Sequence, residues 1–177
     1  KTVFVSGAYG QNVEVFYLAK GDCAVIEMAT CCGLTLVPKE QRRVIFASSY
    51  GLGEVIRDAY LNGARQIHIG LGGSATNDLG LGCMQALGVK FFDADGKPIT
   101  DHISANDFSK IARLDTNDFS DRFKDISVWA VCDVNNPLLG PTGAAAVFGR
   151  QKGVEGDGLG QMQSGKAEAG NILTENL

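Results

Sequence analysis

The stretch that decides the fold runs from Gln66 to Gly80 and reads QIHIGLGGSATNDLG. Its first five residues, Gln66 to Gly70, are a short apolar run of the kind that forms a strand. A loop of glycine and hydroxyl residues follows, and apolar residues then recur at helical spacing from Asp78 to Leu87. Gly88 ends this helix before a further strand, Val89 to Phe92. The succession of strand, loop, helix and strand predicts an α/β fold in which helices flank a mixed β-sheet.

Toward the N-terminus the sequence predicts extended structure and one helix. Three strands are expected over Val3 to Val5, Asn12 to Leu18 and Cys23 to Met28, and the glycines between them favour a meander. A helix is expected from Gly53 to Leu61, where apolar residues recur at helical spacing and Gly63 follows as a stop.

Toward the C-terminus the clearest element is a strand from Ile126 to Cys132, which is rich in β-branched and aromatic residues. Asp93 to Pro98 is expected to form a turn, and a short helix is expected around Phe108 to Ala112. Five glycines weaken a helix over Val154 to Leu177, since each costs about 1 kcal/mol relative to alanine. We expect this helix to depend on packing against a neighbour.

Composition limits the classes of partner. The chain has 177 residues, 45% of them hydrophobic, which suffices for one domain over residues 1–177. With 16 basic and 20 acidic residues its formal charge is −4, so no broad positive field attracts nucleic acid or anionic lipid. No apolar run approaches the roughly 20 residues that span a bilayer. We expect a cytoplasmic protein without nucleic-acid or membrane partners, and a homo-oligomer stays open.

The five cysteines show neither the spacing of a zinc site nor a histidine cluster. Cys31 and Cys32 are adjacent, and a redox pair is one interpretation. Reduced cytosolic thiols usually pack as small hydrophobic groups, and this second interpretation is favoured. His68 lies inside an apolar strand and His102 in a polar stretch, so both are expected to be structural and no serine–histidine nucleophile is predicted.

Glycine is the main deviation in composition, at 23 of 177 residues against a usual share of roughly 7%. Phosphate-wrapping loops and tight turns both explain such an excess. The densest cluster lies between the first strand and its helix, where free amides and hydroxyl groups favour an anion-binding loop. Its binding residues would be Gly72, Gly73, Ser74, Ala75, Thr76 and Asn77. The alternative is a plain turn in which Asn77 or Asp78 caps the helix.

Two further groups of residues follow the strand that ends at Cys132. Asp133 and Asn136 stand at its carboxyl end, where ligands commonly bind in open α/β sheets, although an Asx turn into Pro137 is an equal alternative. Gln151 and Lys152 lie in a glycine-bounded loop after a helix of small residues. Lys152 could reach a phosphate, or it could be a solvated charge at a helix end.

Acidic side chains near an anion-binding loop require a cation between them. Asp78 and Asp133 would repel a phosphate, whereas a nucleotide that arrives with Mg²⁺ reconciles the carboxylates with the loop. One carboxylate left free of metal can then act as a base toward an alcohol. The residues alone therefore favour phosphoryl transfer.

At these residues the sequence resembles the two-domain bacterial glycerate kinases. The family pattern GGSATNDGG stands here as GGSATNDLG over Gly72 to Gly80, and CDVxNPL stands as Cys132 to Leu138. The pattern GA…FGPQKG matches Gly143 to Gly153, with Arg150 in place of the proline. Leu79 also departs from the family, which has glycine there. The likeness covers nearly the whole chain to about residue 153.

The resemblance implies a protein of two α/β domains, the smaller inserted into a flavodoxin-like larger one. This chain would be the inserted domain, cut from a longer polypeptide, and the larger domain would be its partner. The implied activity is ATP-dependent phosphorylation of D-glycerate in the cleft between the domains, with ATP and Mg²⁺ as cofactors. Asp78, Asp133 and Lys152 would be catalytic, both aspartates would bind the metal, and the loop residues with Asn136 and Gln151 would bind substrate or phosphate.

Two other functions are compatible with parts of the sequence. Gly70 to Ala75 fits GxGxxA after a strand, and Asp93 lies near the spacing of a ribose-binding acid, as in a dinucleotide (NAD)-binding domain of an oxidoreductase. A small-anion-binding domain without catalysis would use the same glycine loop.

Overall fold

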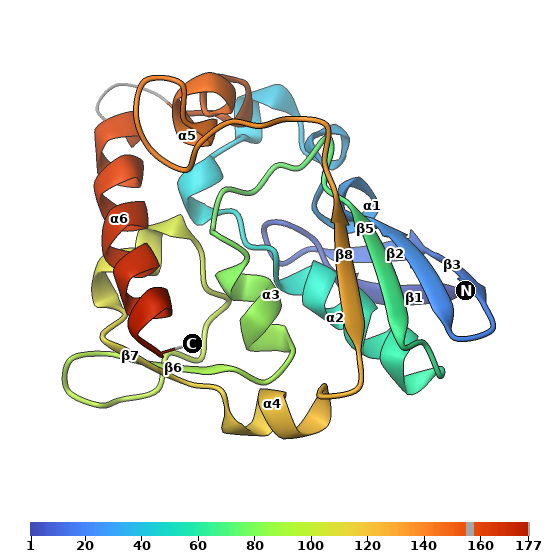
Figure 1. The fold of residues 1–177 in the computed structure, drawn as a ribbon. Coiled ribbons are helices and arrows are strands. Elements are labelled where there is room, and N and C mark those ends of the chain that lie inside the picture. Colours follow the sequence, from blue (N-terminus) through green and yellow to red (C-terminus); the bar gives the residue numbers. More distant parts are fainter. Residues whose placement is uncertain (155–157, 177) are drawn as a thin grey trace.

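A four-stranded mixed sheet forms one side of the computed structural model, which describes residues 1–154 and 158–176 (Figure 1). Its strands stand in the order β3-β4-β5-β8. β3 is antiparallel to β4, whereas β4, β5 and β8 are parallel. The bounds are β3 Leu18–Lys20, β4 Cys23–Glu27, β5 Gln66–Gly70 and β8 Ser127–Val131. The predicted α/β fold with a mixed sheet is confirmed.

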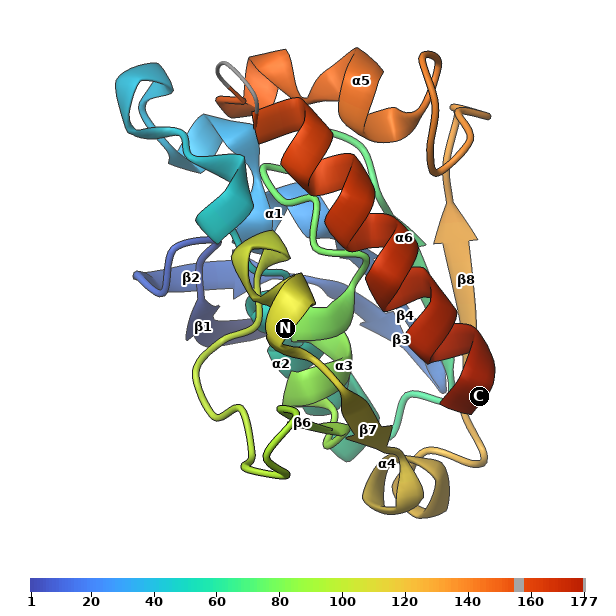
Figure 2. The same ribbon diagram turned by 90° about the vertical axis from the view of Figure 1, so that its left-hand side faces the viewer.

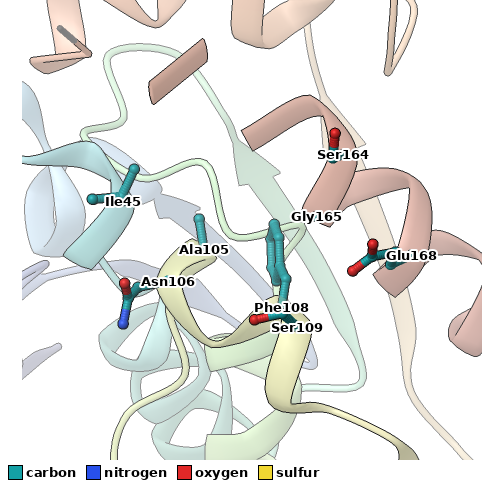
Figure 3. Close-up of a pocket in the computed structure, with 8 residues that line it drawn as sticks. All are labelled: Ile45, Ala105, Asn106, Phe108, Ser109, Ser164, Gly165 and Glu168. Carbon is teal, nitrogen blue, oxygen red and sulfur yellow. The ribbon is translucent and has the colours of Figure 1, made fainter. Parts of the chain in front are cut away.

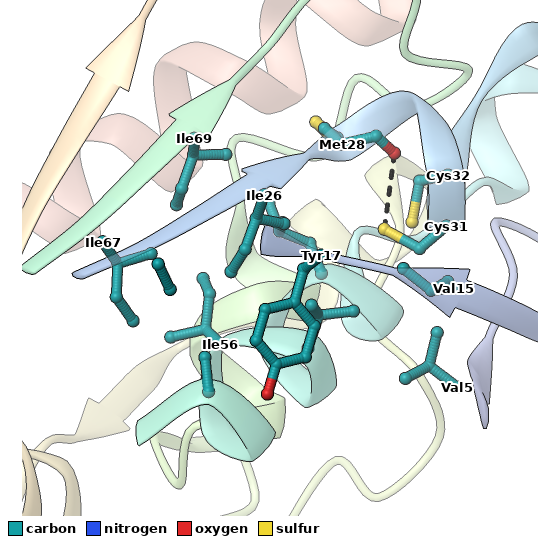
Figure 4. Packing of buried hydrophobic residues seen from close by; sticks show 14 of the residues in the cluster. Val5, Val15, Tyr17, Ile26, Met28, Cys31, Cys32, Ile56, Ile67 and Ile69 are labelled. Carbon is teal, nitrogen blue, oxygen red and sulfur yellow. Dashed lines mark hydrogen bonds between the residues drawn. The ribbon is translucent and has the colours of Figure 1, made fainter. Parts of the chain in front are cut away.

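One face of this sheet is buried because its strands alternate between core and surface. Ile26 lies opposite Ile69 in the register of β4 and β5, and both are buried. Helix α2 (Tyr50–Leu61) contributes Ile56 to the same core cluster, as Figure 4 shows. Successive residues of a strand point to opposite faces, so burying these isoleucines fixes which face the helix covers.

The N-terminal strands form two hairpins and not one meander, which corrects the prediction. β1 (Thr2–Ser6) pairs with β2 (Asn12–Phe16) in a separate sheet. The strand expected from Asn12 to Leu18 ends early because Tyr17 turns inward, where its hydroxyl donates to Asp58 at 2.7 Å. The chain then enters the four-stranded sheet as β3.

A second hydrophobic cluster forms on the other side of α2 and includes Phe91 and Phe108. Around it lie α3 (Leu81–Ala86), η4 (Ala105–Lys110) and α6 (Gly158–Asn176), and strands β6 (Lys90–Phe92) and β7 (Arg113–Asp115) pair as a small sheet of their own. Figure 2 shows α6 running along this side of the molecule. The other elements are α1 Met28–Cys32, η1 Leu34–Leu36, η2 Lys39–Gln41, η3 Val44–Phe46, α4 Asn117–Arg122, α5 Ala144–Phe148 and η5 Arg150–Lys152.

Helix α6 is supported by a neighbour, as the glycine content predicts. A Cβ at Gly165 would lie 3.0 Å from the ring of Phe108, so the absence of a side chain lets η4 pack closely against the helix. η4 replaces the helix expected around residues 108–112 and begins with a capping box between Ser104 and Asp107. The helix expected over residues 78–87 is also shorter than predicted, because left-handed backbone at Leu79 and Gly80 delays its start to Leu81.

The two adjacent thiols are buried, as the favoured interpretation expects. Cys31 and Cys32 are both fully buried and free, and they lie in the main core (Figure 4). The Sγ of Cys31 donates to the carbonyl of Met28 at 3.3 Å, and that of Cys32 to the carbonyl of Ser48 at 3.6 Å. Both therefore act as packing groups in this fold.

The opposite face of the four-stranded sheet carries exposed apolar side chains. Leu18, Val25 and Trp129 lie in one row across the strands and are 73%, 43% and 60% exposed. All five residues of β8 are exposed as well. None of the helices in the described part of the chain has the length and apolar character needed to cross a membrane.

Candidate anion site at the carboxyl edge of the sheet

Three segments meet at one edge of the sheet because three of its strands are parallel. α1 begins at the carboxyl end of β4, the glycine loop begins at that of β5, and the segment with Asp133 begins at that of β8. The amide of Leu71 donates to the carbonyl of Val131 at 3.1 Å, which joins the last two segments at their start. This is the edge at which open α/β sheets bind ligands.

The glycine loop is fixed to the segment that follows α1. The amide of Leu34 donates to the carbonyl of Gly73 at 2.9 Å, and the amide of Ala75 donates to the carbonyl of Cys32 at 2.7 Å. Gly73 has a φ of 69°, a backbone angle that favours glycine. Gly72 and Gly73 stay exposed, so their amides lie on the surface while that of Ala75 is already used.

Lys152 lies against the same loop from a distant part of the chain. Its ammonium donates to Ser74 Oγ at 2.9 Å and to the carbonyl of Thr76 at 2.7 Å. Its pKa is lowered to about 8, first by burial and then by the charge of Lys166, against the attraction of Asp78. The contacts confirm that Lys152 is not a freely solvated charge.

A second lysine, which the sequence analysis missed, braces the loop from the other side. Lys166 of α6 is 2% exposed, and its ammonium donates to Asn77 Oδ1. Burial lowers its pKa, and the carboxylate of Asp78 opposes this effect. Two ammonium groups therefore approach residues 74–77 from η5 and from α6.

Asp78 is buried beneath the loop and is held by groups of the chain itself. Its Oδ2 accepts from the amide and hydroxyl of Ser49, at 2.8 and 2.7 Å, and from the amide of Gly82 at 3.2 Å. Burial is the main influence on its pKa and raises it, while these hydrogen bonds oppose the rise. The contacts connect the starts of α2 and α3, which is what a positioning residue does. Its predicted metal-binding and catalytic roles stay predictions.

The other predicted site residues lie farther out on the same edge. Asp133 is exposed, and Asn136 donates from its Nδ2 to the carbonyl of Thr142 at 2.9 Å within its own loop. The side chain of Gln151 is exposed, while its carbonyl accepts from Arg42 Nη1 at 3.2 Å. Within residues 1–154 and 158–176, no three His, Cys, Asp or Glu side chains gather so as to hold a metal ion.

One exposed carboxylate at this edge is not among the predicted site residues. Glu27 ends β4 and lies opposite Gly70 of β5 in the register. A Cβ at Gly70 would lie 3.9 Å from Glu27 Cγ, so the acidic side chain extends over the start of the glycine loop. Glu27 therefore ends one of the strands that flank β5, and Asp133 follows the end of the other, β8, by two residues.

A pocket of about 340 Å³ lies elsewhere, between η3, η4 and α6 (Figure 3). Asn106, Ser109 and Ser164 give it polar walls, and Glu168 is the one ionisable side chain among the described residues that line it. None of the predicted site residues lines it. A pocket whose one charge is negative does not suit a phosphate.

The structure does not favour the dinucleotide-binding alternative. In that motif the helix begins within the glycine pattern and leads to a parallel strand of the same sheet. Here α3 begins only at Leu81, and the following strand, β6, pairs with β7 in a different sheet. Asp93 is engaged in its turn, where its Oδ1 accepts from the amides of Asp95 and Lys97 at 3.0 and 2.8 Å.

The fold and this edge are typical of α/β domains that bind an anionic ligand beyond the carboxyl ends of parallel strands. The sequence model of the Glycerate kinase family matches residues 1–177, and the chain belongs to that family. It is 41% identical to "Glycerate kinase" of Halalkalibacterium halodurans over 100% of this chain and 47% of that protein. It is 38% identical to "Glycerate 2-kinase" of Escherichia coli over 98% of this chain and 46% of that protein.

The fold agrees with a solved relative over its whole length. The "Crystal structure of putative glycerate kinase 2 from Salmonella typhimurium LT2" superposes on this chain with a TM-score of 0.94 at 37% sequence identity. The match covers 100% of this chain and 48% of that one. The chain thus spans about half the length of the relatives that it matches.

Proposed function

We propose that the full-length protein transfers the γ-phosphoryl group of ATP to a hydroxyl group of D-glycerate. In this proposal residues 1–177 are the inserted domain and supply one wall of the cleft. The observation that carries the proposal is the contact of the Lys152 ammonium with Ser74 and Thr76 in a glycine loop at the carboxyl edge of the sheet. Family membership supports the reaction class.

The loop and Lys152 would hold the phosphate or carboxylate of the substrates. The exposed amides of Gly72 and Gly73 can donate to anionic oxygens. Lys152 has a third N–H beyond the two that donate to the loop, and its charge would stabilise the oxygens of the transferring group. The rest of the loop would fix the conformation of this surface, because its residues already bond to other parts of the chain. These residues are Ser74, Ala75, Thr76 and Asn77.

The acidic residues would divide the remaining tasks between them. A kinase of this family implies a nucleotide with a metal ion, and Mg²⁺ is commonly held by one or two carboxylates together with phosphates and water. Asp133 fits that donor set because its carboxylate is exposed at the edge. When bound, the metal would neutralise phosphate charge. Glu27, the carboxylate left free of metal, would accept the hydroxyl proton, and Asn136 and Gln151 would contact the substrate.

The other wall of the cleft would come from the rest of the polypeptide. The relatives are about twice as long as this chain. The exposed row of Leu18, Val25 and Trp129 lies on a sheet whose carboxyl edge carries the loop. A larger domain packed near this row would remove apolar surface from water and lie beside the proposed site.

The test is ADP release by the full-length protein with D-glycerate, ATP and Mg²⁺. We expect Lys152→Ala to lower kcat/KM by about 100-fold or more, because it removes a charge from the transferring group. Asp133→Ala should raise the Mg²⁺ concentration needed for half-maximal rate. Lys97→Ala is the matched control, since Lys97 lies in an exposed turn.

Two outcomes would contradict the proposal. If the wild-type protein binds D-glycerate but releases no ADP, the alternative of a small-anion-binding domain without catalysis is correct. If ADP release is robust and Lys152→Ala leaves kcat/KM unchanged, the glycine loop is not the phosphate site.

A further inference from the structure

Lys166 is a buried ammonium group for which the proposed mechanism has no use. We infer that Lys166 positions the phosphate-binding residues: its ammonium, buried beneath the glycine loop, holds the Asn77 side chain while the ammonium of Lys152 holds Ser74 and Thr76 of the same loop. The inference rests on the proposed function only in taking the glycine loop as the ligand site. It makes Lys166 a positioning residue that acts through two others and touches no substrate itself.

The position of Lys166 is fixed by the packing of its helix. Gly165, one residue earlier, lets the ring of Phe108 approach α6 closely, and Ala169, three residues later, is buried in the second cluster. The helix therefore has little freedom to rotate, and Lys166 is directed beneath the loop, where its ammonium reaches Asn77. Burying an ammonium group costs free energy unless it is paired, so an apolar residue here would give a more stable helix contact.

Several charged groups lie around the two lysines. Asp78 attracts both, and the charge of Lys166 lowers the pKa of Lys152. Next to Lys152, Arg42 donates to the carbonyl of Gln151 at 3.2 Å, and Arg150 belongs to η5 itself. On η4, Asp107 is engaged with Ser104 and Lys110. On β7, the guanidinium of Arg113 lies over the ring of Phe92, and Asp115 accepts from the amide of Asn117. α5 carries no ionisable residue, and on α6 itself Glu168 faces the pocket of Figure 3.

The charges of Lys152, Lys166 and Asp78 do not cancel, and this affects ligand binding. Two ammonium groups share one buried carboxylate, so the loop carries an excess of positive charge in a poorly solvated place. The pKa of Lys152 is about 8, which means that a modest rise in pH discharges it. A bound phosphate would favour the charged form again. We therefore expect ligand binding to take up a proton above pH 8.

The test compares the protonation of Lys152 in the full-length protein and in variants of Lys166. Lys166→Met removes the charge and keeps an unbranched side chain, Lys166→Arg keeps the charge, and Lys97→Met is a control of equal charge loss in an exposed turn. The midpoint of Lys152 is followed by NMR of isotope-labelled lysine, with Lys152→Arg to assign the signal. The alkaline limb of the kcat/KM profile is measured in parallel.

Removing the positive charge of Lys166 makes the charged form of Lys152 more favourable. Lys166→Met should therefore raise the titration midpoint of Lys152 by at least about half a pH unit. The alkaline limb of kcat/KM should move upward with it, while Lys166→Arg and Lys97→Met keep the wild-type midpoint. An unchanged midpoint in a folded Lys166→Met protein overturns the inference, and so does an equal rise in Lys97→Met. If the midpoint moves but the wild-type protein transfers no phosphoryl group, the proposed function fails and the coupling of the lysines stands.

Discussion

The two loops at the carboxyl edge of the sheet are built in opposite ways. The glycine loop, residues 71–80, is held by contacts from α1, α2, η5 and α6, which are far apart in the sequence. The loop of residues 132–142 is held mainly by itself, through the bond from Asn136 to Thr142 and a weak one from Cys132 Sγ to the carbonyl of Val134. Gln163 of α6 adds a bond from a distant element, from its Nε2 to the carbonyl of Gly140 at 3.3 Å. The strand before this loop, β8, is exposed along its whole length.

The difference shows which part of the proposed site this chain can organise alone. A loop fixed in advance loses little entropy on binding, so the glycine loop is suited to hold a phosphate in one place. The loop with Asp133 keeps more freedom, and we expect its final geometry to depend on metal, nucleotide and the rest of the polypeptide. Substitutions in each loop test whether the two loops differ in this way.

The largest effect is expected at Asp78. Asp78→Ala leaves the amides of Ser49 and Gly82 buried without their acceptor, and it separates the starts of α2 and α3. We expect the free energy of unfolding to fall by about 2–4 kcal/mol, measured by urea denaturation. Asp133→Ala is the matched control and should change it by less than about 0.5 kcal/mol, because that carboxylate is exposed. Equal losses in the two variants would show that the loops do not differ in this way.

A smaller effect should follow from moving α6 away from the loop. Gly165→Ala places a methyl group 3.0 Å from the Phe108 ring, and we expect a loss of about 1–2 kcal/mol together with weaker contact between Lys166 and Asn77. Gly160→Ala, on the same helix, meets nothing within 4 Å and should stabilise by about 0.5–1 kcal/mol. Urea midpoints of the two variants give the comparison, and a shift of the same sign in both would contradict it.

Local sequence patterns predicted the elements that lie close to the glycine loop. The apolar run 66–70 and the β-branched run 126–132 became β5 and β8, and the helix expected from Gly53 is α2, which starts three residues earlier. These segments are specified by their own residues, through alternation or helical spacing. The predicted anion loop also contacts Lys152, which lies 78 residues from Ser74 and 76 residues from Thr76 in the chain.

What the sequence did not reveal depends on contacts between distant residues. No local pattern predicts that Ser49 donates to the buried Asp78, or that β6 pairs with β7 outside the four-stranded sheet. Lys166 had a signal that was overlooked: it stands three residues before Ala169 on the apolar side of a weak helix. A lysine at such a position either distorts the helix to reach water or is buried against a polar partner, and here it is buried.

The smallest effect is expected at Leu79, where the family pattern has glycine and this chain has a left-handed leucine at a φ of 57°. That backbone costs a non-glycine residue about 1–2 kcal/mol, and contact with the second hydrophobic cluster offsets the cost. Leu79→Ala loses the contact and keeps the strain, whereas Leu79→Gly loses both. We therefore expect the glycine variant to be more stable than the alanine variant by about 1 kcal/mol in urea denaturation.

In a helix alanine is usually more stable than glycine, and the expected order at Leu79 is the reverse. The two variants therefore test whether the backbone is strained at the end of the glycine loop. Val147, half exposed within α5, provides the reference, because there alanine should be more stable than glycine by about 1 kcal/mol. If alanine is the more stable residue at both positions, the loop ends without backbone strain, and Leu79 is then retained for its apolar contacts alone.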